Sequence, residues 1–494
     1  MDKKKITQGV FWGGLSSATS LGLKFMTIPI LARLLSPEQF GVVAVALAIM
    51  SFIVMAIGKG GLGAAILYYE NTDPGQYVHT VFWANFFLGT VLALLCYLNA
   101  GWLAEISGVE KAKPYIEVIS FSIPLLLLEQ VGRSLLLLKM EYKKMAGVTL
   151  FASMLGGISA LVLAYSGAGA WSLICQQLVY QVLLMTGFLY MTKFIPKLEF
   201  KRDRLSEIMP YAMRNTASDI LMWCSSQGVI LFVGRFFGAS TVGGYQVSNR
   251  LAQLPREVVG NALDQAVFSG VANSQKGLDK SRTLNHKLEH VWRDFLLVTK
   301  INTYFLGSVY LLLAIYAESV VIIVLGESFY EFWPVFRAMT VFGFIGVFLS
   351  AVYPFLKGIG EDRLVLKLSL YRAILTLLFV YIVAELDGDI VFVTYTLAIV
   401  QLLMLLITVS KLSTKVNSGL SSIIFEFKGV TIGFITLLSL SWPVNEFFSF
   451  YFESMVLSSI FSGFIVLLVT ILILPLLAKN DWLLMKSWLK VKFE

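Results

Sequence analysis

Long apolar stretches alternate with short polar connections along the whole chain. A helix needs about 20 consecutive, mostly apolar residues to cross a hydrocarbon core of about 30 Å. Fourteen stretches have that length, and the pattern predicts helices near residues 8–32, 40–69, 79–102, 115–138, 146–166, 169–192, 206–234, 240–270, 292–316, 332–356, 364–384, 389–410, 429–448 and 455–477. The chain is therefore predicted to be an all-α membrane protein of about 14 transmembrane helices.

The lysines and arginines of the connections test this count independently. Of the 39 Lys and Arg residues, 26 lie on the side that holds the N-terminus, within residues 3–5, 139–144, 193–204, 276–293, 357–367, 411–428 and 479–492. The opposite side carries four: Arg33, Lys111, Lys113 and Arg235. Because cytoplasmic loops collect Lys and Arg, both termini are predicted to be cytoplasmic.

Composition excludes several classes of protein. With 57% hydrophobic and 14% charged residues among 494, the chain lacks the polar residues that soluble domains need for their surfaces. The net charge of +8 does not predict a nucleic-acid partner, because the basic residues stand in short clusters between apolar stretches. The apolar run over residues 9–31 is too long for a signal peptide, so it is interpreted as the first transmembrane helix.

The cysteines and the apparent motifs predict no metal, no cofactor and no enzyme active site. Cys96, Cys175 and Cys224 are far apart in apolar stretches, a spacing that fits neither a metal site nor a disulfide framework. The G-x-G-x-x-G pattern at residues 58–63 lies in a predicted helix with no strand before it, so close helix packing explains it better than nucleotide binding. His286 and His290 do not have the pattern of a zinc protease and are interpreted as a solvated helix face.

An internal repeat indicates the domain organisation. Residues 32–41 and 234–243 share the pattern small-Arg-apolar-apolar-small-x-x-x-apolar-Gly at the outer end of a helix, and their arginines lie 202 residues apart. This separation spans six helices, an even number, so the repeat is parallel about an axis along the membrane normal. We expect a six-helix lobe at residues 1–200, a second at 201–412, two more transmembrane helices at 413–478 and an amphipathic cytoplasmic tail at 479–494.

Nine further cations fall within or at the ends of predicted helices: Lys24, Lys59, Arg133, Arg214, Arg250, Arg256, Lys300, Arg337 and Arg372. A central Lys or Arg facing lipid costs roughly 3 kcal/mol, so nine would cost on the order of 27 kcal/mol. Lys59, Lys300 and Arg372 are candidates to extend toward the membrane surface. The others are expected to face a wet or protein-lined interior.

Few acids stand at comparable depth: Glu129, Asp219, Glu257 and Asp264. Arg133 can pair with Glu129 four residues earlier, which we interpret as a buried structural pair. Arg250 and Lys24 have no acid at helical spacing. A helix-lined cavity with surplus positive charge suits an anion, in particular one with phosphate. Lys24, Arg250 and Arg256 would then contact substrate between the repeats, with extension to the interface as the alternative.

Three stretches resemble a known family: residues 30–41, reading Ile-Leu-Ala-Arg-Leu-Leu-Ser-Pro-Glu-Gln-Phe-Gly, residues 169–178 and residues 245–251. With them the chain resembles bacterial polysaccharide (lipid-linked oligosaccharide) flippases of the multidrug/oligosaccharidyl-lipid/polysaccharide exporter superfamily, particularly colanic-type and teichuronic-type exporters. The resemblance implies two lobes in a V, a cationic central cavity and undecaprenyl-diphosphate-linked oligosaccharide as cargo. A glycan polymerase is a candidate partner.

The resemblance also implies roles for individual residues. Basic residues on the first, second and eighth helices of such flippases contact the diphosphate, and Lys24, Arg250 and, less well by position, Lys59 match them. Some relatives hold sodium with acids of the second lobe. Here Asp219 and Asp264 are the candidates, and the eleventh and twelfth helices have no acid at mid-membrane.

The hypothesis is a carrier that moves a lipid-linked oligosaccharide outward by alternating access, with Lys24 and Arg250 gripping the diphosphate and Arg256 and Arg214 supporting them. A multidrug cation exporter of the same superfamily is an alternative, although it would need carboxylates in the cavity. A membrane glycan polymerase or ligase is a further alternative. Such an enzyme needs a large outer loop with catalytic Arg or His, and the predicted outer loops are short and contain no His.

Overall fold

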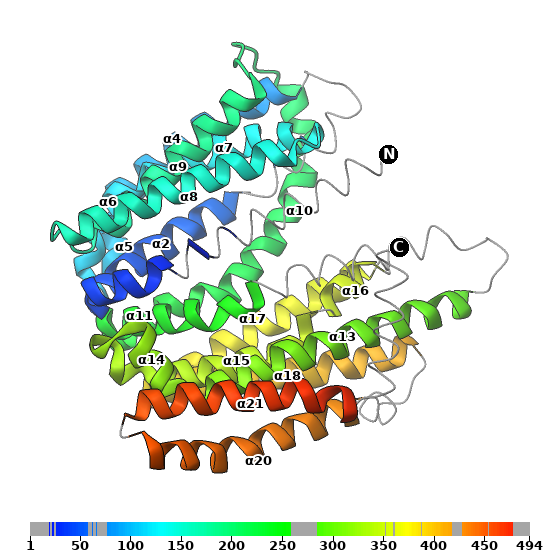
Figure 1. The fold of residues 1–494 in the computed structure, drawn as a ribbon. Helices are drawn as coiled ribbons and strands as arrows, with labels where there is room; N and C mark the ends of the chain where they lie inside the picture. The colour runs from blue at the N-terminus through cyan, green and yellow to red at the C-terminus, as the bar shows by residue number, and fades with distance from the viewer. Residues whose placement is uncertain are drawn as a thin grey trace. The chain divides into compact units, whose positions relative to one another are not determined.

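The computed structural model describes residues 19, 22–23, 26–57, 62, 66, 77–257, 284–350, 352–358, 361–386, 388–416, 427–452 and 454–477. Helices account for nearly all of these residues, and the described part of the chain contains no strand, so the predicted all-α class is confirmed (Figure 1). The chain divides into two compact units, residues 1–247 and 248–494.

Unit 1 is helical from residue 26 to residue 34 and continues with α2 (Pro37–Ile57), α4 (Val78–Leu98), α5 (Ala100–Ile106), η1 (Glu110–Ala112), α6 (Lys113–Ser120), α7 (Ser122–Leu138), α8 (Tyr142–Tyr165), α9 (Trp171–Thr192), α10 (Arg202–Ser226) and most of α11 (Gly228–Pro255). Helices α7, α8 and α9 run side by side (Figure 1). Small residues let them approach closely, as in other membrane bundles. A β-carbon on Gly132 would lie 2.9 Å from Phe188, and one on Gly156 would lie 3.2 Å from the Gln176 carbonyl oxygen.

Unit 2 holds the end of α11 and then α13 (Leu284–Ile315), α14 (Ala317–Leu325), η3 (Glu327–Phe332), α15 (Trp333–Ser350), α16 (Val352–Gly358), α17 (Asp362–Glu385), α18 (Ile390–Val416), α20 (Lys428–Tyr451) and α21 (Met455–Leu477). Its packing again pairs a glycine with an aromatic ring. Gly343 of α15 faces the ring of Tyr310 on α13, and Gly307 of α13 faces the ring of Phe434 on α20.

Within the described residues, nine helices are long and apolar enough to cross a membrane, and a bent pair over residues 110–138 would make a tenth. Large apolar side chains are exposed along α4 and α8, for example Leu94 and Ile158. Water would disfavour such continuous apolar surfaces, whereas lipid matches them. The chain is a multi-pass membrane protein. The count of fourteen also rests on stretches outside the described residues.

The helix predicted over 115–138 is broken into α6 and α7, which meet at an angle of 41°. Pro124 explains the break, because proline has no N–H to donate and its ring clashes with the carbonyl group four residues earlier, that of Ser120. Helix α6 accordingly ends at Ser120.

The domain boundaries predicted at residues 200 and 412 stay predictions. They rest on the repeat, whereas the two units are defined by compactness. The tail predicted at 479–494 lies outside the described residues.

Candidate functional site

The first repeat motif forms a tight turn between two helices because its residues satisfy the start of α2. The Ser36 N–H donates to Gln39 Oε1 at 3.0 Å, and the Gln39 N–H donates to Ser36 Oγ at 3.3 Å. This reciprocal pair is a capping box, which occupies two backbone donors that a helix start leaves free. Pro37 stands at the first helical position and Glu38 in the first turn, where their geometry and charge are favourable.

The second motif also reverses the chain, at Gly238. The backbone of Gly238 leaves helical geometry with φ 78° and ψ 179°. A β-carbon on Gly234 would lie 3.5 Å from a methyl group of Val242. Eight residues of straight helix would separate these positions by about 12 Å, so the two arms of α11 fold back on each other.

The turns of the two motifs touch each other reciprocally. A β-carbon on Gly41 would overlap the carbonyl oxygen of Ala239, and one on Gly243 would overlap the carbonyl oxygen of Pro37. Gly41 aligns with Gly243 in the repeat, and Pro37 aligns with Ala239. Each glycine therefore meets the same position of the other motif, as expected at a two-fold axis. We call this contact the glycine seam.

A loop after α5 contacts both motifs. A β-carbon on Gly108 would lie 2.5 Å from the Arg235 Cα atom, so this loop packs directly on the second motif. Lys111 Nζ forms an ion pair of 2.7 Å with Glu38 Oε1 in the first motif. This loop is thus joined to both of the motifs that form the seam.

Arg250 lies on the second arm of α11, a helix long and apolar enough to cross a membrane, and its distance from the turn predicts its depth. It follows Ala239, at the turn, by 11 residues, which is about 16 Å of helix and about half of a 30 Å core. Its side chain is exposed, and no hydrogen bond or ion pair to it occurs among the described residues. The polar neighbours Gln253 and Asn249 bond to each other at 2.9 Å. Glu257 is the acid whose charge acts on Arg250.

Arg256 follows six residues after Arg250, just beyond the end of α11, and is exposed. It acts electrostatically on Tyr310 and on Arg372 of α17. The Arg372 side chain is half-buried and lies near Tyr353 of α16. Two cations of unit 2, Arg256 and Arg372, are therefore near enough for their charges to interact.

Sequence reasoning did not include Arg372 among the substrate-binding candidates, because it favoured extension toward the membrane surface. Two features could have indicated otherwise: Arg372 lies near the middle of its 24-residue helix, and it has no acid four residues away on either side. Lys300 was also expected to extend toward the membrane surface. It is instead buried and interacts with another residue of the chain.

The predicted Glu129–Arg133 pair is present, but it is long, at 4.0 Å, and Arg133 is half-exposed. Glu129 itself is buried, and Gln181 Nε2 donates to its Oε2 at 3.1 Å. This contact joins α7 to α9, which supports a structural role for the acid.

Several other predicted residues keep the status of predictions. Lys24, Lys59 and Asp264 lie outside the described residues, and Arg214 and Asp219 are on α10 with side chains that are not described. In the part of the chain that the structure does describe, no three His, Cys, Asp or Glu side chains gather as metal ligands would.

The sequence matches a known protein family and several of its relatives. Residues 30–334 match the family described as polysaccharide biosynthesis protein. The succinoglycan biosynthesis transport protein ExoT of Rhizobium meliloti (strain 1021) is 31% identical over 376 residues, covering 76% of this chain and 74% of that protein.

Solved structures share the fold. The lipid II flippase MurJ in its inward closed conformation has a TM-score of 0.77 at 13% identity, covering 94% of this chain and 99% of that one. An inward-facing multidrug resistance transporter of the MATE family has a TM-score of 0.65 at 18% identity, covering 81% of this chain and 94% of that one.

Proposed function

The chain belongs to the polysaccharide biosynthesis protein family, and from that premise we propose that it is a flippase for an undecaprenyl-diphosphate-linked oligosaccharide. The flippase would move this lipid from the cytoplasmic to the outer leaflet of the bacterial cytoplasmic membrane by alternating access, with both termini in the cytoplasm. The family match confirms the resemblance stated from the sequence.

The environment of the Arg250 side chain is the observation that supports an anionic cargo. A guanidinium near mid-membrane is costly unless water or an anion solvates it. Arg250 is exposed there without a hydrogen bond or an ion pair to any described residue. A planar guanidinium group binds best where two acceptor oxygens can take two parallel N–H bonds, and a diphosphate offers such oxygen pairs.

Arg256 and Arg372 support the same choice in unit 2. Two neighbouring guanidinium groups repel each other, and an anion between them would relieve the repulsion. Lys24, Lys59 and Arg214 complete the proposed binding set, and Asp219 and Asp264 remain the candidates for ion coupling.

The glycine seam supports alternating access. A carrier must close its outer side while cargo enters from the inner side. The backbones of the two turns are in direct contact at the seam, so no passage remains between these turns. In this proposal the seam is the closed outer contact, and it parts when the carrier opens outward.

The experiment uses the full chain in proteoliposomes that contain a fluorescent polyprenyl-diphosphate disaccharide. Dithionite, added outside, bleaches only the lipid in the outer leaflet and so reports flipping. Arg250→Ala should slow flipping about 10- to 100-fold, the worth of a charged hydrogen bond, and Arg250→Lys should fall between Arg250→Ala and the parent. Arg363→Ala is the matched control, because Arg363 is exposed in the first turn of α17.

If Arg250→Ala, inserted at normal levels, flips as fast as the parent, the assigned role of Arg250 is wrong. A parent protein that extrudes cationic dyes and leaves the diphosphate lipid in place would instead favour the multidrug exporter.

A further inference from the structure

The segment between α9 and α10, residues 193–201, has a fixed backbone. Helix α9 ends because Lys193 takes a left-handed conformation with φ 54°. The N–H groups of Lys193 and Phe194 then bond back to the Tyr190 and Leu189 carbonyls, at 3.0 and 3.3 Å, which closes the helix end. Pro196 follows, and proline cannot continue a helix. We call residues 193–201 the linker.

Three side chains of the first turns of α4 hold the linker backbone. The Lys197 N–H donates to His79 Nδ1 at 3.2 Å, and Trp83 Nε1–H donates to the Lys197 carbonyl oxygen at 2.8 Å. The Lys201 N–H donates to Thr80 Oγ1 at 3.2 Å. Backbone polar groups satisfied by protein can stay at the edge of a bilayer without water.

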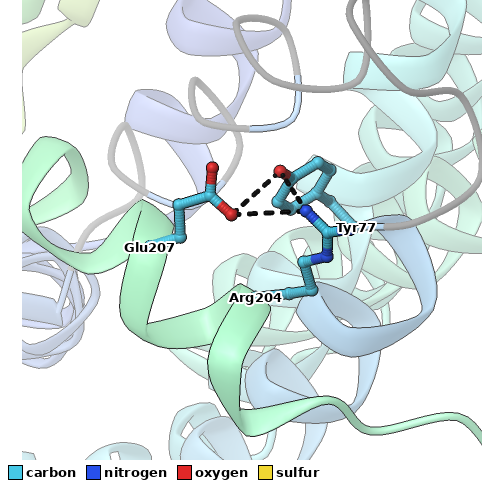
Figure 2. Close-up of polar contacts among 3 residues, drawn as sticks. All are labelled: Tyr77, Arg204 and Glu207. Carbon is cyan, nitrogen blue, oxygen red and sulfur yellow. Dashed lines mark hydrogen bonds and ion pairs between the residues drawn. The ribbon is translucent and has the colours of Figure 1, made fainter.

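Further contacts fasten the start of the linker, and the first turn of α10 that follows it, to the start of α4. At the start of the linker, the Phe194 ring stacks on His79, with centroids 5.1 Å apart. At the start of α10, Tyr77, just before α4, donates to Glu207 Oε2 at 3.1 Å and accepts from Arg204 Nη1 at 3.0 Å (Figure 2). The linker backbone is therefore held in one conformation by its contacts, and it is joined to two membrane-spanning helices, α4 and α9.

The linker exposes apolar and basic side chains together. Leu198 is 90% exposed, Ile195 80% and Phe200 53%, although all three are large and apolar. The exposed Lys193, Lys197 and Lys201 stand between them. Residues 193–204 carry five cations and two acids, Glu199 and Asp203, so the surface is positive.

The level of the linker relative to the membrane follows from its neighbours. It starts one residue after α9 ends and is bonded to the first turns of α4, and both helices are long and apolar enough to span. Trp83 and the exposed Tyr190 lie at this level, and such aromatic residues concentrate where hydrocarbon meets headgroups. The preference of lysines for the cytoplasmic side explains the charge, but it does not explain an exposed Ile, Leu and Phe among them.

We propose that the linker is a binding surface for anionic phospholipid headgroups of the cytoplasmic leaflet. Ile195, Leu198 and Phe200 enter the acyl boundary, and Lys193, Lys197 and Lys201 contact the phosphate groups above it. Such a combination of buried apolar side chains and neighbouring lysines is how interfacial segments select anionic lipid. The inference does not rest on the identity of the cargo.

The test places a fluorescent label at Leu198→Cys of the full chain, in a background where Cys96, Cys175 and Cys224 are alanine. The protein is reconstituted in nanodiscs of phosphatidylcholine and phosphatidylglycerol, without polyprenyl lipid. All discs have the same total composition, with bromine near the top of the acyl chains of either the phosphatidylglycerol or an equal amount of the phosphatidylcholine. Bromine quenches the label only at close range.

We expect quenching in both sets, and at least about twofold more when bromine is on the anionic lipid, because each lysine near the surface attracts anionic headgroups. The triple variant Lys193→Gln, Lys197→Gln, Lys201→Gln should remove this preference and keep the quenching itself. The matched control is Lys139→Gln, Lys143→Gln, Lys144→Gln, which removes equal charge from residues just after α7 and in the first turn of α8, on the side predicted to be the same.

Absence of quenching would overturn the proposal, because the apolar side chains would then face water or another protein. Equal quenching by both lipids would also overturn it, because the linker would then have no preference for anionic headgroups. Equal loss of the preference in the control would overturn it too, because anionic lipid would then be attracted by the whole basic side and not by the linker.

Discussion

Single polar side chains decide where several helices of unit 1 begin and how they are joined. Ser36 and Gln39 start α2, and Tyr77 connects the start of α4 to α10 through Arg204 and Glu207. Tyr77 is buried, with 3% of its surface exposed, so its hydroxyl group depends on these two partners.

Tyr77→Phe should lower the free energy of unfolding by about 1 kcal/mol, the net worth of a buried hydrogen bond. The measurement is the thermal unfolding midpoint of the full chain in detergent, compared with Tyr165→Phe, which removes a hydroxyl from an exposed tyrosine at the end of α8. An equal midpoint for Tyr77→Phe and the parent would show that the Tyr77 contacts do not stabilise the fold.

The same residue predicts a pH dependence. Loss of solvation on burial, and then the hydrogen bond to Glu207, raise the pKa of Tyr77. The folded protein thus holds the phenol proton more tightly than the unfolded chain. The stabilisation is complete below the unfolded pKa of about 10 and is lost as pH rises through the folded pKa. The difference in midpoint between the parent and Tyr77→Phe should therefore narrow above a pH of about 10, and a widening gap would contradict this assignment.

At the scale of elements, the two repeat motifs are helical hairpins that meet through glycine. The seam requires hydrogen at Gly41 and Gly243, because a methyl group at either position would overlap a carbonyl oxygen of the other motif. The capping box and Pro37 position the first hairpin so that Gly41 faces this contact.

Gly41→Ala should part the seam, because overpacking costs about 1–3 kcal/mol and the facing backbone cannot turn aside as a side chain can. Val242 is fully buried in the second hairpin. In a background without the natural cysteines, labelling of Val242→Cys by a membrane-impermeant maleimide should rise about fivefold or more with Gly41→Ala. Gly147→Ala, where a β-carbon meets nothing within 4 Å, is the matched control. Unchanged labelling would mean that the hairpins tolerate the methyl group without opening.

At the scale of the whole molecule, charge is distributed in a way that suits outward transport of an anion. The side predicted to be cytoplasmic holds 26 of the 39 cations, and four lie on the opposite side. This asymmetry predicts an orientation with both termini in the cytoplasm. The membrane potential, negative inside, then favours outward movement of negative charge by about 2.3 kcal/mol per charge per 100 mV.

Outward flipping of the diphosphate lipid should therefore be faster with a potassium diffusion potential that is negative inside, and an ionophore that removes the potential should abolish the difference. The measurement is the dithionite assay in proteoliposomes at fixed lipid composition. A rate independent of potential would mean that protein cations or a coupled ion move with the cargo and cancel its charge.

The sequence by itself determined the all-α class, the positions of most helices and the two hairpin motifs. The length of an apolar stretch and the charge of a loop are local properties of the sequence. They determine the helices because each span in a bilayer must form its backbone hydrogen bonds within itself. Helices α17, α18 and α21 begin within two residues of their predicted starts for this reason.

Only the tertiary structure decided that Gly41 and Gly243 touch, that Arg372 lies near Arg256 and that the linker is held on α4. These residues are distant along the chain, and a hydropathy pattern carries no information about which helix faces which. Packing sets such contacts through the shapes of small residues and single hydrogen bonds, and these depend on partners that no local stretch contains.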